Sequence, residues 1–350
     1  MSQIKVLVVD DSAFMRKAIS AMLEKDPMIK VVGTARNGEE ALELIRKLDP
    51  DVVTLDIEMP VMDGLTALRH IMMESPRPVI MVSSLTQEGA EATFKALELG
   101  AVDYIPKQLS KVSLEIVKIE KELQEKVKSV AKKKGKIKVQ RKKPTEQKTI
   151  DVVKFSNKKQ LRDFVGIGVS TGGPMAVQQV LTKLDKDFPA PIVIAQHMPE
   201  AFTGPFAKRL NEICKIEVKE AEHGEPVKVG VAYIARGGHH LRVLHKTTHI
   251  ELEISKEPKD ALYKPSVNEL MLSIAKHLGK RAIGVILTGM GNDGLIGIRE
   301  LKKRGGRALA QSEKTCVVYG MPRAIVEENL ADEVVDITEM AEAIVRNLYM

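Results

Sequence analysis

Short apolar runs alternate with amphipathic stretches along the first 120 residues of the chain. The runs that predict strands are IKVLVVD (4–10), KVVGTA (30–35), DVVTLD (51–56), PVIMVSS (78–84) and DYI (103–105). Between them, apolar residues recur with helical spacing at 13–25, 38–48, 64–74 and 88–99. Strands that alternate with helices form right-handed βαβ units. The pattern therefore predicts an α/β domain with a five-stranded, doubly wound parallel sheet covered by helices on both faces.

A second alternating pattern begins near Phe155. Its predicted strands are DFVGIGVS (163–170), APIVIAQ (190–196), VAYIA (231–235), HLRVLHK (240–246), HIELEIS (249–255), AIGVILTG (282–289) and RALAQ (307–311). Its predicted helices lie at 174–184, 203–213, 266–278 and 294–304. The close spacing of the strands between 231 and 255 indicates an antiparallel hairpin. We expect a second doubly wound, mostly parallel α/β domain to which this hairpin is appended.

A basic segment separates the two patterns. A predicted helix that begins near Leu109 loses its apolar periodicity after about Val130. Residues 126–148 then hold eleven Lys or Arg and one Glu, a local charge of +10 that leaves the rest of the +7 chain at −3. The segment has no aromatic residue on which bases could stack, so we expect no nucleic-acid binding. We predict one domain at 1–125, a solvated linker at 126–155 and a second domain at 156–350.

The composition is that of a soluble globular protein, with 44% hydrophobic and 29% charged residues. No apolar stretch approaches the ~20 residues that span a bilayer, so we expect no direct membrane insertion. Asp10 and Asp11 interrupt the first apolar run, which argues against a signal peptide. Cys214 and Cys316 lie far apart and form no CxxC pattern. We expect buried, reduced thiols and a cytoplasmic location.

Polar side chains follow the predicted strands of the first domain where each strand ends. Asp10 and Asp11 end the first strand, Asp56 the third and Ser83 the fourth, while Lys107 follows the fifth. The carboxyl ends of parallel strands meet at one edge of the sheet. Three carboxylates brought together there repel one another, and a hard divalent cation relieves that repulsion. Any one of these residues could be an ordinary strand end, but the combination suits Mg²⁺-assisted phosphorylation of a carboxylate.

Over roughly residues 1–120 the chain resembles response-regulator receiver domains. The resemblance implies that Asp56 accepts the phosphoryl group and that Asp10 and Asp11 are metal-site acids beside it. The other roles it implies are a backbone carbonyl ligand at Glu58, a switch hydroxyl at Ser83, a switch aromatic at Tyr104 and a phosphate-binding lysine at Lys107. Receivers often carry proline directly after that lysine, whereas here Pro106 precedes it.

A glycine-rich turn, Gly168-Val169-Ser170-Thr171-Gly172-Gly173, joins a predicted strand to a predicted helix. Glycines on both sides allow a tight turn that exposes the Ser170 hydroxyl at the start of the helix. Backbone N–H groups there could stabilise an oxyanion. Taken alone, the turn could equally bind a phosphate or be purely structural. It lacks the Lys-Ser/Thr ending of a P-loop and is not a GxGxxG motif.

A histidine and an aspartate follow two other strands of the second domain. His197 comes directly after APIVIAQ, and Asp293 comes shortly after AIGVILTG. With Ser170 they place a nucleophile, a general base and an orienting acid at one sheet edge. The four histidines in or beside the predicted hairpin form no HExxH motif, and we expect surface or loop side chains rather than zinc ligands. They are His239, His240, His245 and His249.

The order Ser170, His197, Asp293 differs from that of α/β-hydrolases, in which the acid precedes the histidine. Over nearly its full length the chain instead resembles the chemotaxis receptor protein-glutamate methylesterases. Five segments carry the resemblance in the expected order: GVSTGGP (168–174), AQHMP (195–199), YKPSVNEL (263–270), LTGMGNDG (287–294) and VVYGMPRAI (317–325). One departure is Asn268, where members commonly carry aspartate; it lies outside the predicted triad.

The resemblance implies hydrolysis of glutamyl methyl esters on the cytoplasmic helices of methylated chemoreceptors, and deamidation of particular glutamines. It implies Ser170, His197 and Asp293 as the catalytic residues, with oxyanion donors at the Met290 N–H and the Thr171–Gly172 turn. A chemotaxis histidine kinase would be the phosphodonor. Mg²⁺ would serve the receiver, and ester hydrolysis would need no cofactor. The rival interpretations are a receiver-linked DNA-binding regulator, which lacks a helix-turn-helix candidate, and a receiver-controlled esterase for small molecules.

Overall fold

The computed structural model describes residues 3–107, 113–131, 134 and 159–350. The chain divides into two compact units, Met1–Pro144 and Thr145–Met350. Most of the segment predicted to be a linker, 126–155, lies outside the described residues. So do the predicted helix start near Leu109 and the start of the second pattern near Phe155.

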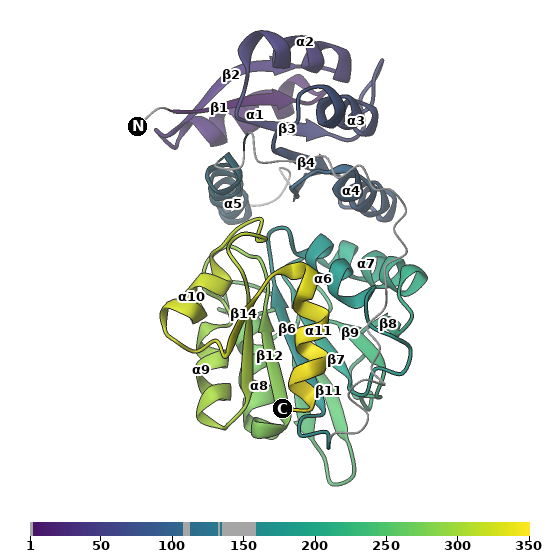
Figure 1. Cartoon of the computed structure of the whole chain (residues 1–350). Coiled ribbons are helices and arrows are strands. Elements are labelled where there is room, and N and C mark those ends of the chain that lie inside the picture. Colours follow the sequence, from purple (N-terminus) through teal and green to yellow (C-terminus); the bar gives the residue numbers. More distant parts are fainter. Residues whose placement is uncertain (1–2, 108–112, 132–133, 135–158) are drawn as a thin grey trace. The chain divides into compact units, whose positions relative to one another are not determined.

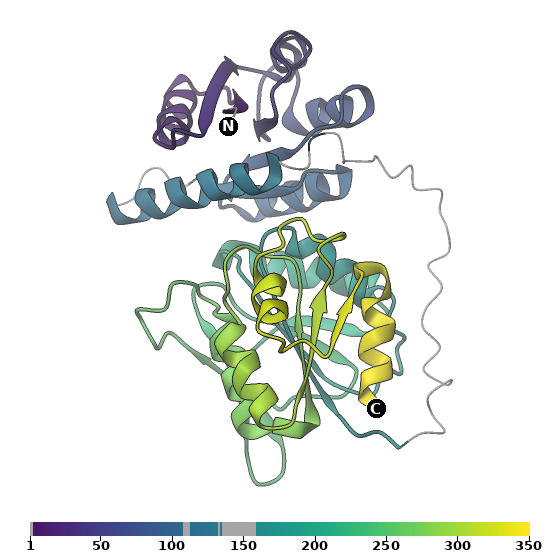
Figure 2. The same cartoon turned by 60° about the vertical axis from the view of Figure 1, so that its left-hand side comes forward.

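The first unit contains a parallel five-stranded sheet in the order β2-β1-β3-β4-β5. Its elements are β1 Ile4–Val9, α1 Ala13–Glu24, β2 Ile29–Ala35, α2 Gly38–Leu48, β3 Val52–Asp56, α3 Gly64–Glu74, β4 Val79–Ser83, α4 Gln87–Leu99, β5 Asp103–Pro106 and α5 Ser113–Ala131. Helix α1 packs against α5, while α3 packs against both α2 and α4 (Figures 1 and 2). The helices thus cover both faces, and the predicted doubly wound fold is confirmed.

Local sequence explains where these helices begin. Four of them start directly after a residue whose side-chain oxygen accepts a backbone N–H of the first turn, which satisfies a donor that the helix itself leaves unpaired. The capping residues of α1 to α4 are Ser12, Asn37, Asp63 and Thr86. Each cap stands in the loop at the carboxyl end of a strand, so the same loops that start the helices also form the predicted acidic pocket.

The second unit is built on a seven-stranded sheet in the order β14-β13-β12-β6-β7-β9-β8, with all pairs parallel. Its first elements are β6 Phe164–Val169, α6 Gly173–Leu181, β7 Ile192–Gln196, α7 Glu200–Ile213, β8 Glu217–Glu220, β9 Val231–Ile234, β10 His240–His245 and β11 Ile250–Ser255. The rest are α8 Val267–His277, the 3₁₀ turn η2 Gly279–Arg281, β12 Ala282–Ile286, α9 Leu295–Lys303, β13 Arg307–Gln311, α10 Met321–Glu327, β14 Glu333–Val335 and α11 Ile337–Leu348.

The predicted hairpin is present as an antiparallel pair of its own, β10 with β11. Strand β9, which had been grouped with it by spacing, belongs to the parallel sheet between β7 and β8. The edge strands β8 and β14 were not predicted because they have only four and three residues, too few to show an apolar pattern. An edge strand can be this short because a single neighbour supplies its hydrogen bonds.

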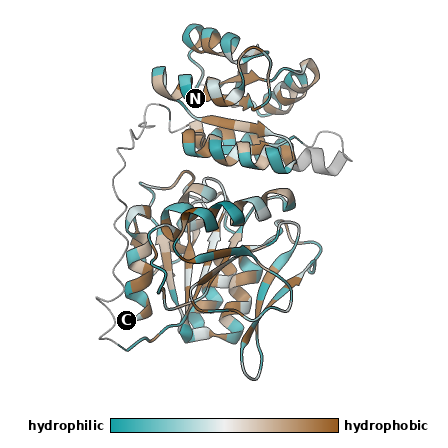
Figure 3. Cartoon of the chain, turned by 90° about the vertical axis from the view of Figure 1, so that its right-hand side faces the viewer, coloured by the Kyte–Doolittle hydropathy of each residue, from teal (hydrophilic) through white to brown (hydrophobic). Residues whose placement is uncertain are grey.

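Both units have interiors of aliphatic side chains. The central strands β3, β4, β6, β7 and β12 are buried along their whole length, as expected for parallel strands covered on both faces. Figure 3 shows hydrophobic colour concentrated on the strands, whereas the helices carry both hydrophobic and hydrophilic colour. Within the residues that the structure describes, no helix is long and apolar enough to cross a membrane.

Candidate active site

Three side chains meet at the carboxyl edge of the seven-stranded sheet. Ser170 directly follows β6, His197 directly follows β7, and Asp293 lies in the loop between β12 and α9. Strands β12, β6 and β7 are neighbours, and the chain leaves β6 toward β7 but later returns to β12 on its other side. Ser170 and Asp293 therefore flank the point where the strand order reverses, which is where open α/β sheets bind ligands.

The three side chains form a continuous hydrogen-bonded line. The Ser170 hydroxyl lies 3.1 Å from Nδ1 of His197. The other ring nitrogen, Nε2, lies 2.8 Å from Oδ2 of Asp293. Because a carboxylate only accepts, Nε2 carries the proton, and Nδ1 has a lone pair directed at the serine. This arrangement can remove a proton from the Ser170 hydroxyl while Asp293 balances the charge that forms on the ring.

Backbone contacts hold the nucleophile and base loops together. The Ser170 N–H donates to the Thr288 carbonyl, and the His197 N–H donates to the Val169 carbonyl. The side-chain amide of Gln196 donates to the carbonyls of both Ser170 and His197, at 3.0 and 3.1 Å. Sequence analysis missed Gln196, and its only signal was membership of the AQHMP segment. Its amide joins the two loops, so a shift of one moves the other.

The Asp293 carboxylate sits against the amino end of helix α8. It accepts hydrogen bonds from the Ser266 hydroxyl at 3.1 Å, the Val267 N–H at 2.7 Å and the Asn268 N–H at 2.9 Å. Burial favours the neutral acid, but the hydrogen bond from His197, its charge and the two backbone donors together lower the pKa of Asp293. The positive end of the helix dipole favours the same ionised state. Asp293 is therefore held ionised and in one orientation.

Asn268 links two helices beside this carboxylate. Its side-chain oxygen accepts the N–H groups of Gly294 and Gly297 at 3.0 and 3.1 Å, in the first turn of α9. Asp293, which precedes α9, in turn caps α8, so each loop satisfies the other helix. Asn268 lies outside the predicted triad, but its backbone N–H donates directly to Asp293. The spacing of these residues in the sequence could not show that the start of α8 contacts the loop before α9.

The predicted oxyanion donors lie around Ser170. Gly172 has a left-handed backbone, with φ of 72°, which turns the chain directly after the nucleophile. A Cβ atom on Gly289 would stand 2.8 Å from Cβ of Ser170, so glycine at this position lets the loop that carries Met290 pass beside the nucleophile. Among the hydrogen bonds of the described residues, none uses the N–H of Thr171, Gly172 or Met290.

A tyrosine covers one face of the histidine. The ring of Tyr263 stacks on His197 with centroids 4.1 Å apart and planes inclined by 13°. Sequence analysis did not single out Tyr263, although it begins the segment YKPSVNEL. The contact restricts rotation of the imidazole and places an electron-rich ring against the group that becomes cationic when it accepts a proton.

A second cluster lies at the carboxyl edge of the five-stranded sheet. Asp10, Asp11 and Asp56 each direct a carboxylate oxygen to a place where these atoms lie within 4.8 Å of one another. Lys107 lies 2.6 Å from Oδ2 of Asp56 and 3.2 Å from Oδ2 of Asp10. Within the described part of the chain, Oδ2 of Asp10 is buried and has no hydrogen-bond donor beyond the ion-paired Lys107. An incompletely satisfied set of carboxylate oxygens fits a hard divalent cation such as Mg²⁺.

The surroundings of Asp56 disfavour its ionised form. Burial and the nearby Asp10 raise the pKa of Asp56 to about 6, against 3.8 for an ordinary aspartate, although Lys107 opposes both effects. For Lys107, burial favours the neutral amine, but the hydrogen bond and charge of Asp56 prevail and raise the pKa of the lysine. The pocket thus contains a charged lysine that does not balance all the carboxylates around it.

The remaining predicted receiver residues lie near this pocket. The Ser83 hydroxyl, at the end of β4, donates to the Gly89 carbonyl at 3.1 Å, on the α4 side. Tyr104, on β5, is 5% exposed. Lys126 lies over the Tyr104 ring, with Nζ 5.5 Å from the ring centroid, and donates to the Tyr104 carbonyl. Glu58 has an exposed side chain in the loop after β3, two residues beyond Asp56.

Other sequence expectations are partly corrected. His245 and His249 are exposed and His239 is partly buried, but His240 is 1% exposed, so the surface interpretation was wrong for His240. It begins β10 and packs against the α8 side of the domain rather than facing solvent. Neither cysteine forms a disulfide, and Cys316 is buried whereas Cys214 is only partly so.

Comparisons with known proteins identify the family of each domain. The CheB methylesterase family matches residues 165–344, and the response regulator receiver domain family matches residues 6–117. The chain is 63% identical to protein-glutamate methylesterase/protein-glutamine glutaminase 1 of Oleidesulfovibrio alaskensis, and the match covers 99% of this chain and 100% of that protein. It is 61% identical to the corresponding protein 2 of Nitratidesulfovibrio vulgaris, with the same coverage. The crystal structure of the Thermotoga maritima CheB methylesterase catalytic domain matches 53% of this chain and 98% of that chain, with 40% identity and a TM-score of 0.52.

Proposed function

This chain belongs to the CheB methylesterase family and carries a response regulator receiver domain, and from that membership we propose a specific reaction and control. The enzyme hydrolyses glutamyl methyl esters on the cytoplasmic helices of chemoreceptors by a Ser170-His197-Asp293 mechanism, controlled by phosphorylation of Asp56. The observation that carries the proposal is the unbroken line of hydrogen bonds from the Ser170 hydroxyl to the Asp293 carboxylate.

In the first half of the reaction, Ser170 Oγ attacks the carbonyl carbon of the ester and His197 Nδ1 takes its proton. The tetrahedral intermediate collapses with loss of the methoxy group, which leaves as methanol after taking the proton from His197. The glutamate side chain is then bound to Ser170 as an ester. Asp293 stabilises the imidazolium and fixes the tautomer of the neutral imidazole.

In the second half, His197 removes a proton from water, whose oxygen attacks the same carbonyl carbon. The Ser170 oxygen leaves and recovers its proton from His197, and the receptor side chain is released as the carboxylic acid, which loses its remaining proton to solvent and becomes the carboxylate. Deamidation of a glutamine follows the same steps with ammonia as the leaving group. Neither half of the reaction requires a metal ion.

We assign the oxyanion site to the N–H groups of Met290 and of the Thr171–Gly172 turn. These donors flank Ser170 and make no other hydrogen bond among the described residues. The close approach of Gly289 to Ser170 supports placing the Met290 loop at the developing negative charge. Donors already in position stabilise the tetrahedral intermediate without reorganisation.

We assign phosphorylation to Asp56, with a chemotaxis histidine kinase as the phosphodonor. Asp10, Asp11, Asp56 and the backbone carbonyl of Glu58 would hold Mg²⁺, which would supply positive charge to offset repulsion between the carboxylates and the incoming phosphoryl group. Lys107 then binds a phosphoryl oxygen, Ser83 turns from Gly89 toward the phosphoryl group, and Tyr104 shifts with it.

We further propose that the receiver, residues 1–125, represses the catalytic domain, residues 156–350, until Asp56 is phosphorylated, with the basic linker 126–155 joining the two domains. A change from mostly restrained to mostly free needs only a few kcal/mol of differential stability. Removal of residues 1–150 should raise basal ester hydrolysis, while Asp56→Ala in the full chain should remain at the basal rate whatever phosphodonor is added. A fragment no faster than the unphosphorylated full chain would contradict restraint.

The main test measures methanol released from receptor carrying labelled methyl esters. Ser170→Ala should reduce the rate by about 10⁶-fold, because loss of the serine removes the covalent route. Thr247→Ala, in the exposed turn of the β10–β11 hairpin, is the matched control and should retain the wild-type rate. Retention of more than a tenth of the activity in Ser170→Ala would contradict the serine mechanism. Turnover of a simple aryl ester without turnover of receptor would contradict the receptor as substrate.

A further inference from the structure

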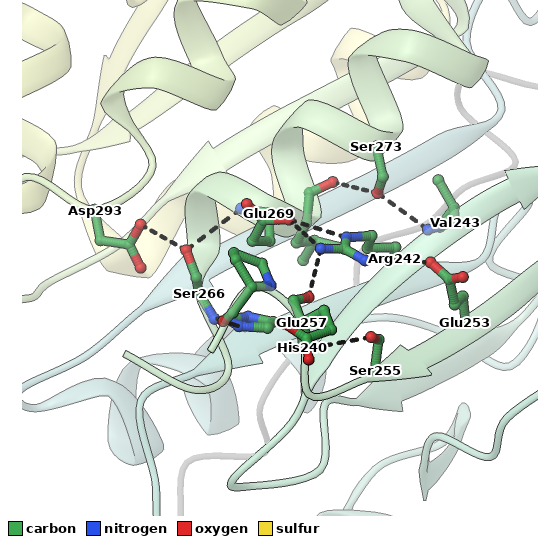
Figure 4. A network of polar contacts seen from close by, with 12 residues as sticks. His240, Arg242, Val243, Glu253, Ser255, Glu257, Ser266, Glu269, Ser273 and Asp293 are labelled. Carbon is green, nitrogen blue, oxygen red and sulfur yellow. Dashed lines mark hydrogen bonds and ion pairs between the residues drawn. The ribbon is translucent and has the colours of Figure 1, made fainter. Parts of the chain in front are cut away.

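His240 is a buried histidine that contacts none of the three proposed catalytic side chains. It stands at the start of β10, and its side chain is enclosed by the loop that precedes α8. Figure 4 shows Ser266 between His240 and Asp293. A line of hydrogen bonds therefore continues beyond Asp293, through Ser266, to a second imidazole.

The partners of His240 specify its protonation. Nε2 lies 3.2 Å from the carbonyl oxygen of Pro258, which can only accept, so Nε2 must carry a proton. Nδ1 lies 3.3 Å from the backbone N–H of Ser266, which can only donate, so Nδ1 must keep its lone pair. Only the neutral ring with its proton on Nε2 satisfies both contacts.

Ser266 passes this restraint to Asp293. It is the N-cap of α8, and its hydroxyl accepts the Glu269 N–H while donating to Oδ1 of Asp293. The next two residues supply the backbone donors to the same carboxylate. A change in the position of the Ser266 backbone would therefore disturb three of the hydrogen bonds that orient Asp293.

Further contacts attach β10 to α8. Arg242 donates from Nε and Nη2 to Oε2 of Glu269, at 2.9 and 2.6 Å. One turn along the helix, the Ser273 hydroxyl accepts the Val243 N–H at 3.0 Å. The hairpin strand thus follows the amino-terminal half of α8, and these attachments limit movement of the helix relative to His240.

We propose that His240 is a positioning residue for ester hydrolysis, which, through its Nδ1 acceptor, holds the Ser266 N-cap and thereby keeps Asp293 aligned with His197. The inference rests on the proposed role of Asp293 and deepens it. His240 does not touch the reacting atoms, so its contribution is to the orientation of Asp293 rather than to proton transfer.

The electrostatic surroundings agree with a neutral ring. Burial lowers the pKa of His240; the Pro258 carbonyl and Glu269 oppose this effect, while Arg242 and Lys264 add to it. A proton on Nδ1 would face the Ser266 N–H with no acceptor between them. The neutral state that the hydrogen bonds require is therefore also the state that the surroundings favour.

Two substitutions of similar polarity distinguish the role of Nδ1 of His240 from the role of Nε2. In His240→Asn the side-chain oxygen can occupy the place of Nδ1 and accept from Ser266, whereas in His240→Gln the amide reaches the place of Nε2 and leaves the Ser266 N–H unpaired. We expect His240→Asn to stay within about threefold of the wild-type kcat and His240→Gln to lose at least about tenfold, with KM unchanged. His245→Asn and His245→Gln, on the exposed end of the same strand, are matched controls and should both behave as wild type.

The full-length variants should be assayed for labelled-methanol release and for the rate at which a fluorophosphonate labels Ser170. The labelling rate reports serine activation whatever the natural substrate is. A wild-type chain that fails to label would contradict the proposed function. A wild type that labels normally, with both His240 variants equally fast or equally slow, would overturn the role of His240 alone.

A second measurement does not depend on activity. Long-range ¹H–¹⁵N NMR spectra of the histidine rings distinguish the two neutral tautomers and the cation. We expect His240 to be neutral at pH 7 with its proton on Nε2, in the wild type and in Ser170→Ala alike. A proton on Nδ1 would remove the acceptor that the proposal requires and would overturn it.

Discussion

Two buried aspartates stand at equivalent places in the two domains, and their surroundings shift their pKa values in opposite directions. Asp56 ends β3 and Asp293 follows β12, each near the point where the strand order of its sheet reverses. Around Asp56 are two further carboxylates and one lysine, and its pKa is raised. Around Asp293 are a helix amino end, a hydroxyl and an imidazole, and its pKa is lowered.

The difference follows from the donors rather than from the residue type. An aspartate with all its oxygens satisfied is stable as an anion and can orient a histidine through a reaction cycle. An aspartate that is buried among other carboxylates keeps negative charge that the surrounding donors do not neutralise. Binding of a cation and addition of a phosphoryl group can change that charge. The comparison teaches that burial alone assigns no role to a carboxylate, and that the number and kind of donors decide it.

Among the tests of this contrast, the largest expected effect is the loss of kcat when the negative charge of Asp293 is removed. Asp293→Asn keeps the shape of the side chain, but its amide can donate to His197 and so favour the tautomer with a proton toward Ser170. We expect kcat to fall on the order of 10⁴-fold, with native circular dichroism. A loss below tenfold would mean that Asp293 does not orient the base, and the contrast between the two aspartates would fail.

The next largest effect is expected on the Mg²⁺ affinity of the cluster formed by Asp10, Asp11 and Asp56. Asp11→Asn removes one of the three carboxylates, so Mg²⁺ should bind at least about tenfold more weakly by isothermal titration calorimetry. Glu39→Gln, in the first turn of α2, changes charge equally on the same domain and should leave Mg²⁺ affinity unchanged. Equal affinities in all three proteins would place the ion elsewhere.

A smaller effect should come from the ring stacked on His197. Tyr263→Phe keeps the stacking and should stay close to the wild-type kcat, while Tyr263→Leu removes an aromatic face and should lower kcat by about tenfold. The measurement is ester hydrolysis over a range of substrate concentrations, so that kcat and KM are separated. If the leucine variant matched the phenylalanine variant, the stack would contribute only packing.

The smallest effect is on the pH dependence of the free energy of unfolding. Asp56 and Asp293 contribute to it with opposite signs. The raised pKa of Asp56 means that the folded receiver binds the proton more tightly than the unfolded chain, so its free energy of unfolding falls as pH rises from 3.8 to about 6. Asp56→Asn should remove that slope and stabilise the receiver at pH 7 by about 1 to 2 kcal/mol. Asp293, with its lowered pKa, contributes stability that is lost as pH falls below the ordinary aspartate value.

Hydrogen exchange resolved by domain can measure both slopes in the full chain. Glu39→Gln again serves as the receiver control because its side chain is exposed. A receiver that becomes less stable in Asp56→Asn would show that the ion pair with Lys107 outweighs burial. That outcome would remove the electrostatic contrast between Asp56 and Asp293.

Much of this protein follows from sequence alone because the relevant signals are local. Apolar periodicity is a property of neighbouring residues, and it predicted the two α/β domains and most of their strands. Since parallel strands end at a common edge, the polar residues after IKVLVVD, DVVTLD, APIVIAQ and AIGVILTG could be assigned to two clusters. The structure brings Ser170, His197 and Asp293 into hydrogen-bonding distance as that argument predicts.

Tertiary structure decided the surroundings of those side chains. Ser266 and Asn268 reach Asp293 only because α8 begins against the loop before α9, and His240 is buried only because β10 packs along α8. Those contacts join residues 25 or more positions apart, and no periodicity records them. The residue types at the strand ends were thus readable from the chain, whereas the donors that set their charge and orientation depend on how separate elements pack, which is a property of the whole fold.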